Sequence, residues 1–147
     1  MTIKPDQPCP CGGTIFASCY ASCCQPMHLT NGHAAGATAE MLMRSRFSAY
    51  ALGLVDYLVA TTAPQSRDKT LAADIAHTIE TTQWLSLDVL NTQQGGINDK
   101  MGKVTFLAHY LDKTKPNQSK PSKLHERSRF KRYEGRWVYV DGELFNE

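Results

Sequence analysis

The sequence predicts an α+β protein in which a long N-terminal helix packs across a curved antiparallel sheet, preceded by a small cysteine-rich zinc knuckle. All five cysteines lie within residues 9–24, the segment 39–62 is strongly apolar, and from residue 84 onward apolar side chains alternate with a period of two. Helices followed by a run of strands are typical of α+β domains. We expect the curved sheet and the helix to form a cone whose mouth can hold a ligand.

The length and net charge of the chain limit the functional classes to which the protein can belong. A chain of 147 residues that is 41% hydrophobic can bury one sizeable core plus a small appendage. Its 16 basic and 14 acidic residues give a net charge of +2, which argues against a nucleic-acid-binding protein. Because no apolar run could serve as a signal peptide or a membrane span, we expect a cytoplasmic protein without membrane contact.

The first half of the chain is expected to hold the knuckle and the helices. Residues 1–8 read as a disordered lead-in, and residues 25–37, rich in proline and glycine, read as a linker. Thr38 is a suitable N-cap for a helix from Ala39 to Thr62, bent near Gly53 and ended by Pro64. A second, shorter helix or a turn is predicted over 68–82.

The second half is expected to form the sheet, with strands over 84–90, 103–111, 124–133 and 136–140. In the first strand, Leu85, Leu87 and Val89 alternate with polar or aromatic neighbours and are expected to share the buried face. Residues 113–123 read as a polar loop. Glu134-Gly135 is expected to close a hairpin between the last two strands.

The cysteine cluster is the best candidate site. In a reducing compartment five clustered cysteines indicate metal ligands or free thiols and not disulfides. A Cys-x-Cys pair in a glycine turn and a Cys-Cys pair at the start of a short helix can supply four thiolates to a tetrahedral zinc ion. The predicted ligands are Cys9, Cys11, Cys23 and Cys24.

Three further residues near the cluster leave alternatives open. Cys19 could replace Cys23 or Cys24 as a ligand, or it could be a spare thiol. His28 and His33 are close enough in sequence to bind metal, but a lone histidine in a linker is usually solvated, so neither is included. The competing interpretation of the whole cluster is a set of thiols without metal.

The larger domain offers a candidate pocket. Glu126 shares a strand face with Leu124 and Phe130, which would place its carboxylate inside the cone as a weak candidate for a general acid or base. The other residues expected around the pocket are Arg44, Arg46, Tyr50, Tyr57, Trp84, Trp137 and Tyr139. The preferred interpretation is a structural Glu–Arg pair that fixes the helix against the sheet, so the sequence favours a binding module over an enzyme.

Two parts of the chain carry a family resemblance. Cys9-Pro10-Cys11-Gly12-Gly13 followed by Tyr20-x-x-Cys23-Cys24 resembles the SEC-C motif, the zinc-binding sequence at the C-terminus of the SecA translocation ATPase. The remaining chain resembles the YchJ-like family, in which that motif precedes a domain similar to nuclear transport factor 2. The segments that carry this second resemblance are 38–50, 56–62, 84–87, 125–130 and 135–142.

The resemblance implies a SEC-C-like motif over residues 1–30 and a cone-shaped, cystatin-like domain similar to nuclear transport factor 2 over 38–147. It also implies one Zn²⁺ per chain at the four cysteines and no established reaction. By analogy with SecA and its chaperone, it implies that the motif recognises a protein partner, while the larger domain supports it as a monomer or homodimer.

Two other functions stay open. One is a small-molecule-binding or enzymatic domain that uses Glu126 in the pocket. The other is nucleic-acid binding through the knuckle and the basic residues beyond position 112, which ranks last because of the low net charge.

Overall fold

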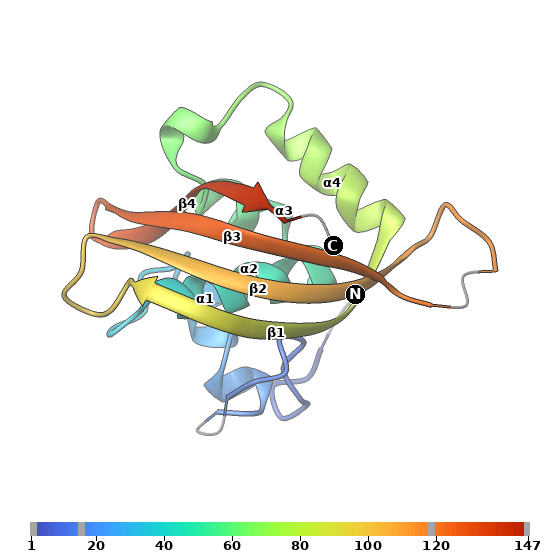
Figure 1. The fold of residues 1–147 in the computed structure, drawn as a ribbon. Helices are drawn as coiled ribbons and strands as arrows, with labels where there is room; N and C mark the ends of the chain where they lie inside the picture. The colour runs from blue at the N-terminus through green and yellow to red at the C-terminus, as the bar shows by residue number, and fades with distance from the viewer. Residues whose placement is uncertain (1–2, 15–16, 118–119, 146–147) are drawn as a thin grey trace.

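A four-stranded antiparallel sheet, in the order β1-β2-β3-β4, is covered on one face by helices in the computed structural model, which describes residues 3–14, 17–117 and 120–145 (Figure 1). The helical elements are η1 (Tyr20–Ser22), α1 (Gln25–Leu29), α2 (Ala39–Leu52), α3 (Val55–Ala60), η2 (Pro64–Ser66) and α4 (Leu71–Thr81). The strands are β1 (Thr82–Gln94), β2 (Met101–Asp112), β3 (Ser122–Tyr133) and β4 (Arg136–Leu144). The predicted α+β fold is confirmed.

The long helix is shorter than predicted. Thr38 caps it as expected, because its side chain accepts a hydrogen bond from the Met41 amide. Gly53 adopts a left-handed conformation with φ of 77° and ends α2, so residues 39–62 form two helices and not one bent helix. Pro64 does not end α3 but begins η2.

A β-bulge in β1 corrects the predicted strand face. The pairing of β1 with β2 shifts between Trp84 and Ser86, so Leu85 is an extra residue on its strand. Leu85 is therefore 42% exposed, whereas Trp84 turns inward and packs near Phe47. Strict alternation could not place these side chains, because it assumes an unbroken pleat.

Strand β2 follows the predicted alternation. Val104, Phe106 and Ala108 occupy every second position of β2, and all three are buried. Glu134 and Gly135, both with positive φ, form the two-residue turn between β3 and β4, as predicted.

The N-terminal segment is more ordered than predicted. Backbone hydrogen bonds join Tyr20 to Gln7 and Ala21 to Pro5, so the described part of the expected lead-in pairs with the chain after Cys19. Residues 25–29 of the expected linker form α1, which Pro26 can start because proline suits the first turn of a helix. Helix α1 packs against α2, and the N-terminal segment that contains it lies below β1 in Figure 1.

Trp137 ties the sheet to the chain that precedes α2. Its side chain is fully buried, and its indole Nε1 donates a hydrogen bond of 3.1 Å to the carbonyl oxygen of Ala37. The guanidinium of Arg132 lies 4.3 Å from the centre of the indole ring. These contacts fix the start of α2 against β4, and so set the helix's position over the sheet.

Candidate metal centre and cavity

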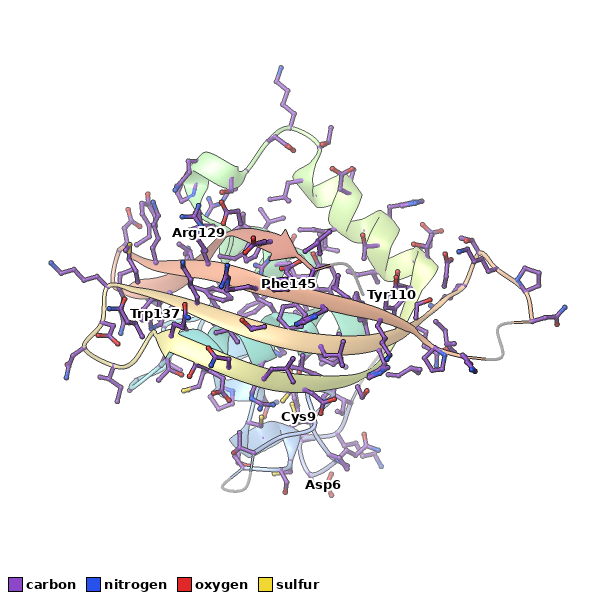
Figure 2. The ribbon with its side chains drawn as sticks, viewed as in Figure 1. Asp6, Cys9, Tyr110, Arg129, Trp137 and Phe145 are labelled. Carbon is purple, nitrogen blue, oxygen red and sulfur yellow. The ribbon has the colours of Figure 1, made fainter. Side chains whose placement is uncertain are left out.

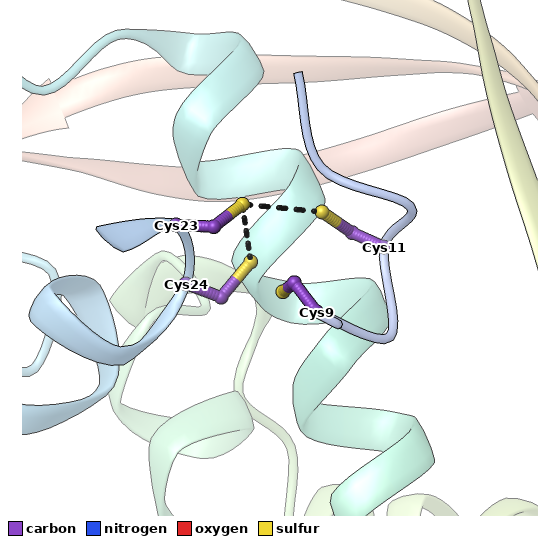
Figure 3. A group of neighbouring side chains, drawn as sticks. All are labelled: Cys9, Cys11, Cys23 and Cys24. Carbon is purple, nitrogen blue, oxygen red and sulfur yellow. Dashed lines mark hydrogen bonds between the residues drawn. The ribbon is translucent and has the colours of Figure 1, made fainter. Parts of the chain in front are cut away.

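Four cysteine sulfurs converge beside α2. Cys9 and Cys11 come from the N-terminal turn, and Cys23 and Cys24 come from the chain that leads into α1 (Figure 3). The Sγ atoms of Cys9, Cys11, Cys23 and Cys24 all lie within 4.8 Å of one another. Cys23 Sγ stands 3.4 Å from Cys11 Sγ and 3.9 Å from Cys24 Sγ, distances at which no disulfide is formed.

This donor set fits a metal ion. Four sulfurs held about 2.3 Å from a tetrahedral zinc ion would stand about 3.8 Å from one another, close to the two distances above. Cys9, Cys11 and Cys24 are buried, at 4%, 0% and 2% exposure, so the site would be shielded from water. The cluster can therefore hold a metal ion with little rearrangement.

Local backbone geometry explains how the first pair of sulfurs is presented. Gly13 has φ of 71°, and a Cβ there would stand 2.7 Å from the carbonyl oxygen of Ala17, so the turn requires glycine. Its amide donates to Cys11 Sγ at 3.3 Å.

Helix α2 supplies two polar groups to the cluster. Ser48 Oγ donates to Cys24 Sγ at 3.2 Å and lies 3.5 Å from Cys9 Sγ. Arg44 Nη1 donates to the carbonyl oxygens of Cys11 and Gly13 and lies 4.0 Å from Cys11 Sγ. Sequence reasoning missed Ser48, although its position four residues after Arg44 puts both on one helix face.

The thiols share protons unequally. The pKa of Cys9 falls because Cys11 donates to its thiolate, and the pKa of Cys11 falls to about 7 because Cys23 donates to it. The pKa values of Cys23 and Cys24 rise because their protons serve as the donors to Cys11. Keeping all four sulfurs as thiolates therefore requires added positive charge, of which the Arg44 guanidinium supplies one unit and a divalent cation would supply two.

The remaining candidate ligands lie outside the cluster. Cys19 Sγ bonds to the hydroxyl of Ser22, and His33 is exposed. His28 is neither a ligand nor solvated: its ring bonds to the Tyr20 hydroxyl and to the Ser45 carbonyl, and it packs edge-on to Tyr57. Burial lowers the pKa of His28, which favours its neutral form.

A cavity of about 270 Å³ lies between α2 and the sheet. Its lining is mostly apolar, with Arg46, Thr78, Glu126 and Ser128 among its polar members. The apolar and aromatic lining residues are Met43, Phe47, Tyr50, Trp84, Phe106, Ala108, Leu124, Phe130 and Tyr139. A concave, largely apolar space with a few polar groups is the usual form of a small-molecule site.

Arg46 is anchored at one end of its guanidinium. Its Nη1 donates to the Leu58 carbonyl at 2.9 Å and to the Thr61 hydroxyl at 2.8 Å. The guanidinium carbon Cζ lies 4.8 Å from the centre of the Tyr139 ring. Burial lowers the pKa of Arg46 and raises that of Tyr139 to about 12, so the arginine stays charged and the tyrosine stays neutral.

Glu126 points into the cavity without pairing with Arg46. Its carboxylate accepts a hydrogen bond of 2.7 Å from Ser128, and the backbone of Gly142 lies so close that a Cβ there would stand 2.4 Å from Glu126 Oε2. No ion pair within 4.0 Å joins Arg46 to any described carboxylate. Burial raises the pKa of Glu126.

The structure separates the residues that the sequence grouped around one pocket. Arg46, Tyr50, Trp84, Glu126 and Tyr139 all line the cavity. Three others lie elsewhere. Arg44 contacts the cysteine cluster, Tyr57 bonds through its hydroxyl to Ser45, and Trp137 is sealed in the core.

Comparisons with known proteins agree on one family. Residues 38–142 match the family model described as the middle NTF2-like domain of YchJ. A UPF0225 protein of Streptomyces coelicolor is 39% identical over 142 residues, covering 97% of this chain and 99% of the relative. A UPF0225 protein of Sodalis glossinidius is 42% identical over 135 residues, covering 92% of this chain and 82% of the relative.

Two solved structures share the fold. The solution structure of a SEC-C motif-containing protein from Rhodopseudomonas palustris superposes with a TM-score of 0.77 at 31% identity, covering 95% of this chain and all of that one. A crystal structure of a SEC-C motif-containing protein from Psychrobacter arcticus gives 0.72 at 27% identity, covering 97% of this chain and 85% of that one. Within the described residues, no helix has the length and apolar character needed to cross a membrane.

Proposed function

The chain belongs to the UPF0225 family, with its YchJ-type NTF2-like domain, and on that premise we propose that it is a zinc-dependent protein-interaction module. Cys9, Cys11, Cys23 and Cys24 hold one Zn²⁺, which fixes a SEC-C-type motif spanning residues 1–30 on the domain that spans 38–147. The convergence of four sulfurs within 4.8 Å carries this proposal.

The choice of zinc follows from the donors. Four thiolates in tetrahedral array with no open position are typical of structural zinc sites. The N–H of Gly13 and the hydroxyl of Ser48 contact the sulfurs directly and orient them, as outer contacts of metal ligands do. Such an ion stabilises structure and performs no chemistry of its own.

Metal content tests this assignment. Protein purified in reducing buffer without added zinc is expected to contain one equivalent of zinc per chain by mass spectrometry of metals. Cys11→Ser is expected to lose it, because Cys11 is fully buried among the other sulfurs. Cys19→Ser, the matched control, is expected to keep it, because Cys19 bonds to Ser22 outside the cluster.

Two results would overturn the assignment. Absence of zinc from the parent protein even after reduction and zinc addition would reject the metal site. Loss of zinc in Cys19→Ser with retention in Cys11→Ser would reject this ligand set.

An exposed apolar residue in the cysteine-rich segment is a candidate contact for a protein partner. Leu29, at the end of α1 in the cysteine-rich segment, is 77% exposed, the highest exposure among the large apolar side chains of the described residues. Figure 2 shows Cys9 on the side of this segment nearer the sheet and Asp6 at its outer end.

A substitution pair tests this contact. With the zinc-loaded protein as bait, Leu29→Glu is expected to reduce recovery of a partner cross-linked in cells by about tenfold, as for an interface residue that contributes about 1.4 kcal/mol to binding. Leu90→Glu, an equally drastic change at an exposed residue of β1, is expected to leave recovery unchanged. Equal recovery with both variants would exclude Leu29 from the interface.

A second candidate function is small-molecule binding in the cavity. The specific observation that favours it is the separation of Arg46 from Glu126, because a structural pair would have closed the space between them. Nucleic-acid binding is not proposed. Two of the late arginines, Arg127 and Arg129, pair with Glu143 and Asp141 across the β3–β4 hairpin and are partly neutralised.

A further inference from the structure

We propose that the cavity binds a small carboxylate with a flat apolar body, held by the Nε/Nη2 edge of Arg46. This inference rests on the small-molecule function proposed above and names its ligand class. It is carried by the unused donors of Arg46, by the lack of any described carboxylate within 4.0 Å of its guanidinium, and by the aromatic walls.

The free donors of Arg46 form the edge that suits a carboxylate. Nη1 is used by Leu58 and Thr61, whereas Nε and Nη2 bond to nothing among the described residues. Both atoms keep some accessible surface, because the buried side-chain nitrogens without a partner among the described residues do not include them. Parallel N–H groups on Nε and Nη2 match the two oxygens of a carboxylate in a bidentate pair.

Charge balance favours an anion over a neutral group. A partly buried guanidinium is costly unless an anion contacts it, and among the described residues Arg46 is contacted directly by neutral oxygens and the face of Tyr139. A ligand carboxylate would supply the missing counter-charge. Nη1 stays bonded to α3, so the fork is already oriented before the ligand arrives.

Glu126 is the carboxylate that could oppose this ligand. When ionised it would repel a second carboxylate; when protonated it would be able to donate a hydrogen bond to one. Burial raises its pKa and so favours the neutral form. The charged groups that act on it are Arg46 from α2 and Asp141 from β4, which oppose each other.

Aromatic side chains define the body of the ligand. Phe47, Trp84, Phe106 and Phe130 line the cavity, and Trp84 packs at 5.8 Å from Phe47 and 5.3 Å from Tyr110 between ring centres. A volume of about 270 Å³ is enough for a ligand body of one ring or two fused rings. Trp84 Nε1 finds no acceptor among the described residues, so a ligand or water oxygen nearby would relieve a buried unpaired donor.

Matched probes test the proposal on the unaltered protein. Benzoate and 2-naphthoate are titrated into zinc-loaded wild-type protein and compared with benzamide and 2-naphthamide, their neutral counterparts. Isothermal titration gives affinity, and amide chemical shifts locate the site. We expect the carboxylates to bind at least about tenfold more tightly than the amides, with shifts at cavity-lining residues.

Three variants assign the effect to its residues. Arg46→Lys keeps the charge but loses the fork, and is expected to weaken 2-naphthoate by about tenfold or more. Glu126→Gln cannot ionise and so cannot repel the ligand carboxylate, and it is expected to bind 2-naphthoate no more weakly than the wild type does. Arg129→Lys, an exposed arginine of β3 outside this cavity, is the control and is expected to bind as wild type.

Each contrary result has its own meaning. Equal binding of carboxylates and amides, or tighter binding of the amides, would overturn the ligand class while leaving a small-molecule site in place. Failure of all four probes to shift any cavity residue would overturn both the class and the small-molecule function. The wild-type comparison decides these outcomes even if Arg46→Lys does not fold.

Discussion

Replacement of Cys24 with serine is expected to lower the free energy of unfolding by about 4 kcal/mol, the stabilisation that a metal contributes at a free concentration a thousand times its Kd. Cys24 is 2% exposed and lies between Cys23 Sγ and the hydroxyl of Ser48. Losing one of four ligands would release the ion and leave buried thiols without their shared cation. Urea unfolding monitored by circular dichroism measures the change.

The same loss is expected when a strong chelator removes metal from the wild-type protein. Cys19→Ser is the control, because its thiol lies outside the cluster, and its unfolding midpoint is expected to match the parent. If Cys24→Ser were as stable as the parent and the chelator changed neither protein, the cluster would not be a stabilising metal site.

Trp137→Ala is expected to cost about 4 kcal/mol, within the range of about 3–5 kcal/mol for deleting a fully buried aromatic side chain. The change would open a void beside Ala37, leave the carbonyl oxygen of Ala37 without its donor and remove the surface on which Arg132 lies. Chemical denaturation gives the free energy of unfolding of both proteins.

A milder variant separates packing from hydrogen bonding. Trp137→Phe keeps most of the ring but loses the Nε1 donor, so its cost is expected to be clearly smaller than that of Trp137→Ala. Similar stability of Trp137→Ala and the parent would show that the contact between β4 and residue 37 does not hold the start of α2.

The metal-site candidates and the inward face of β3 could be predicted from sequence, for physical reasons. Cysteines clustered this closely are typical of metal sites, so Cys9, Cys11, Cys23 and Cys24 could be singled out from the sequence alone. Glu126 could be placed inside because β3 has no bulge before Phe130, so its pleat alternates regularly there.

The errors arise where local backbone geometry decides the outcome. The bulge at Leu85 and the left-handed Gly53 each depend on tertiary packing that periodicity does not encode. Arg44 and Arg46 are two residues apart on α2, and only their rotation about the helix axis assigns one to the cysteines and the other to the cavity. A list of charged residues near a pocket could not separate them.

That division of α2 has a thermodynamic consequence. Arg44 and Ser48 on one side of the helix contact the cysteine cluster, while Arg46 and Tyr50 on another side line the cavity. If metal binding changes the affinity of the cavity for a ligand through this helix, occupancy of the cavity must change metal affinity by the same factor, because linkage is reciprocal. Helix α2 then couples the two sites. A metal titration with and without a cavity ligand, or a ligand titration with and without metal, would measure the same coupling free energy.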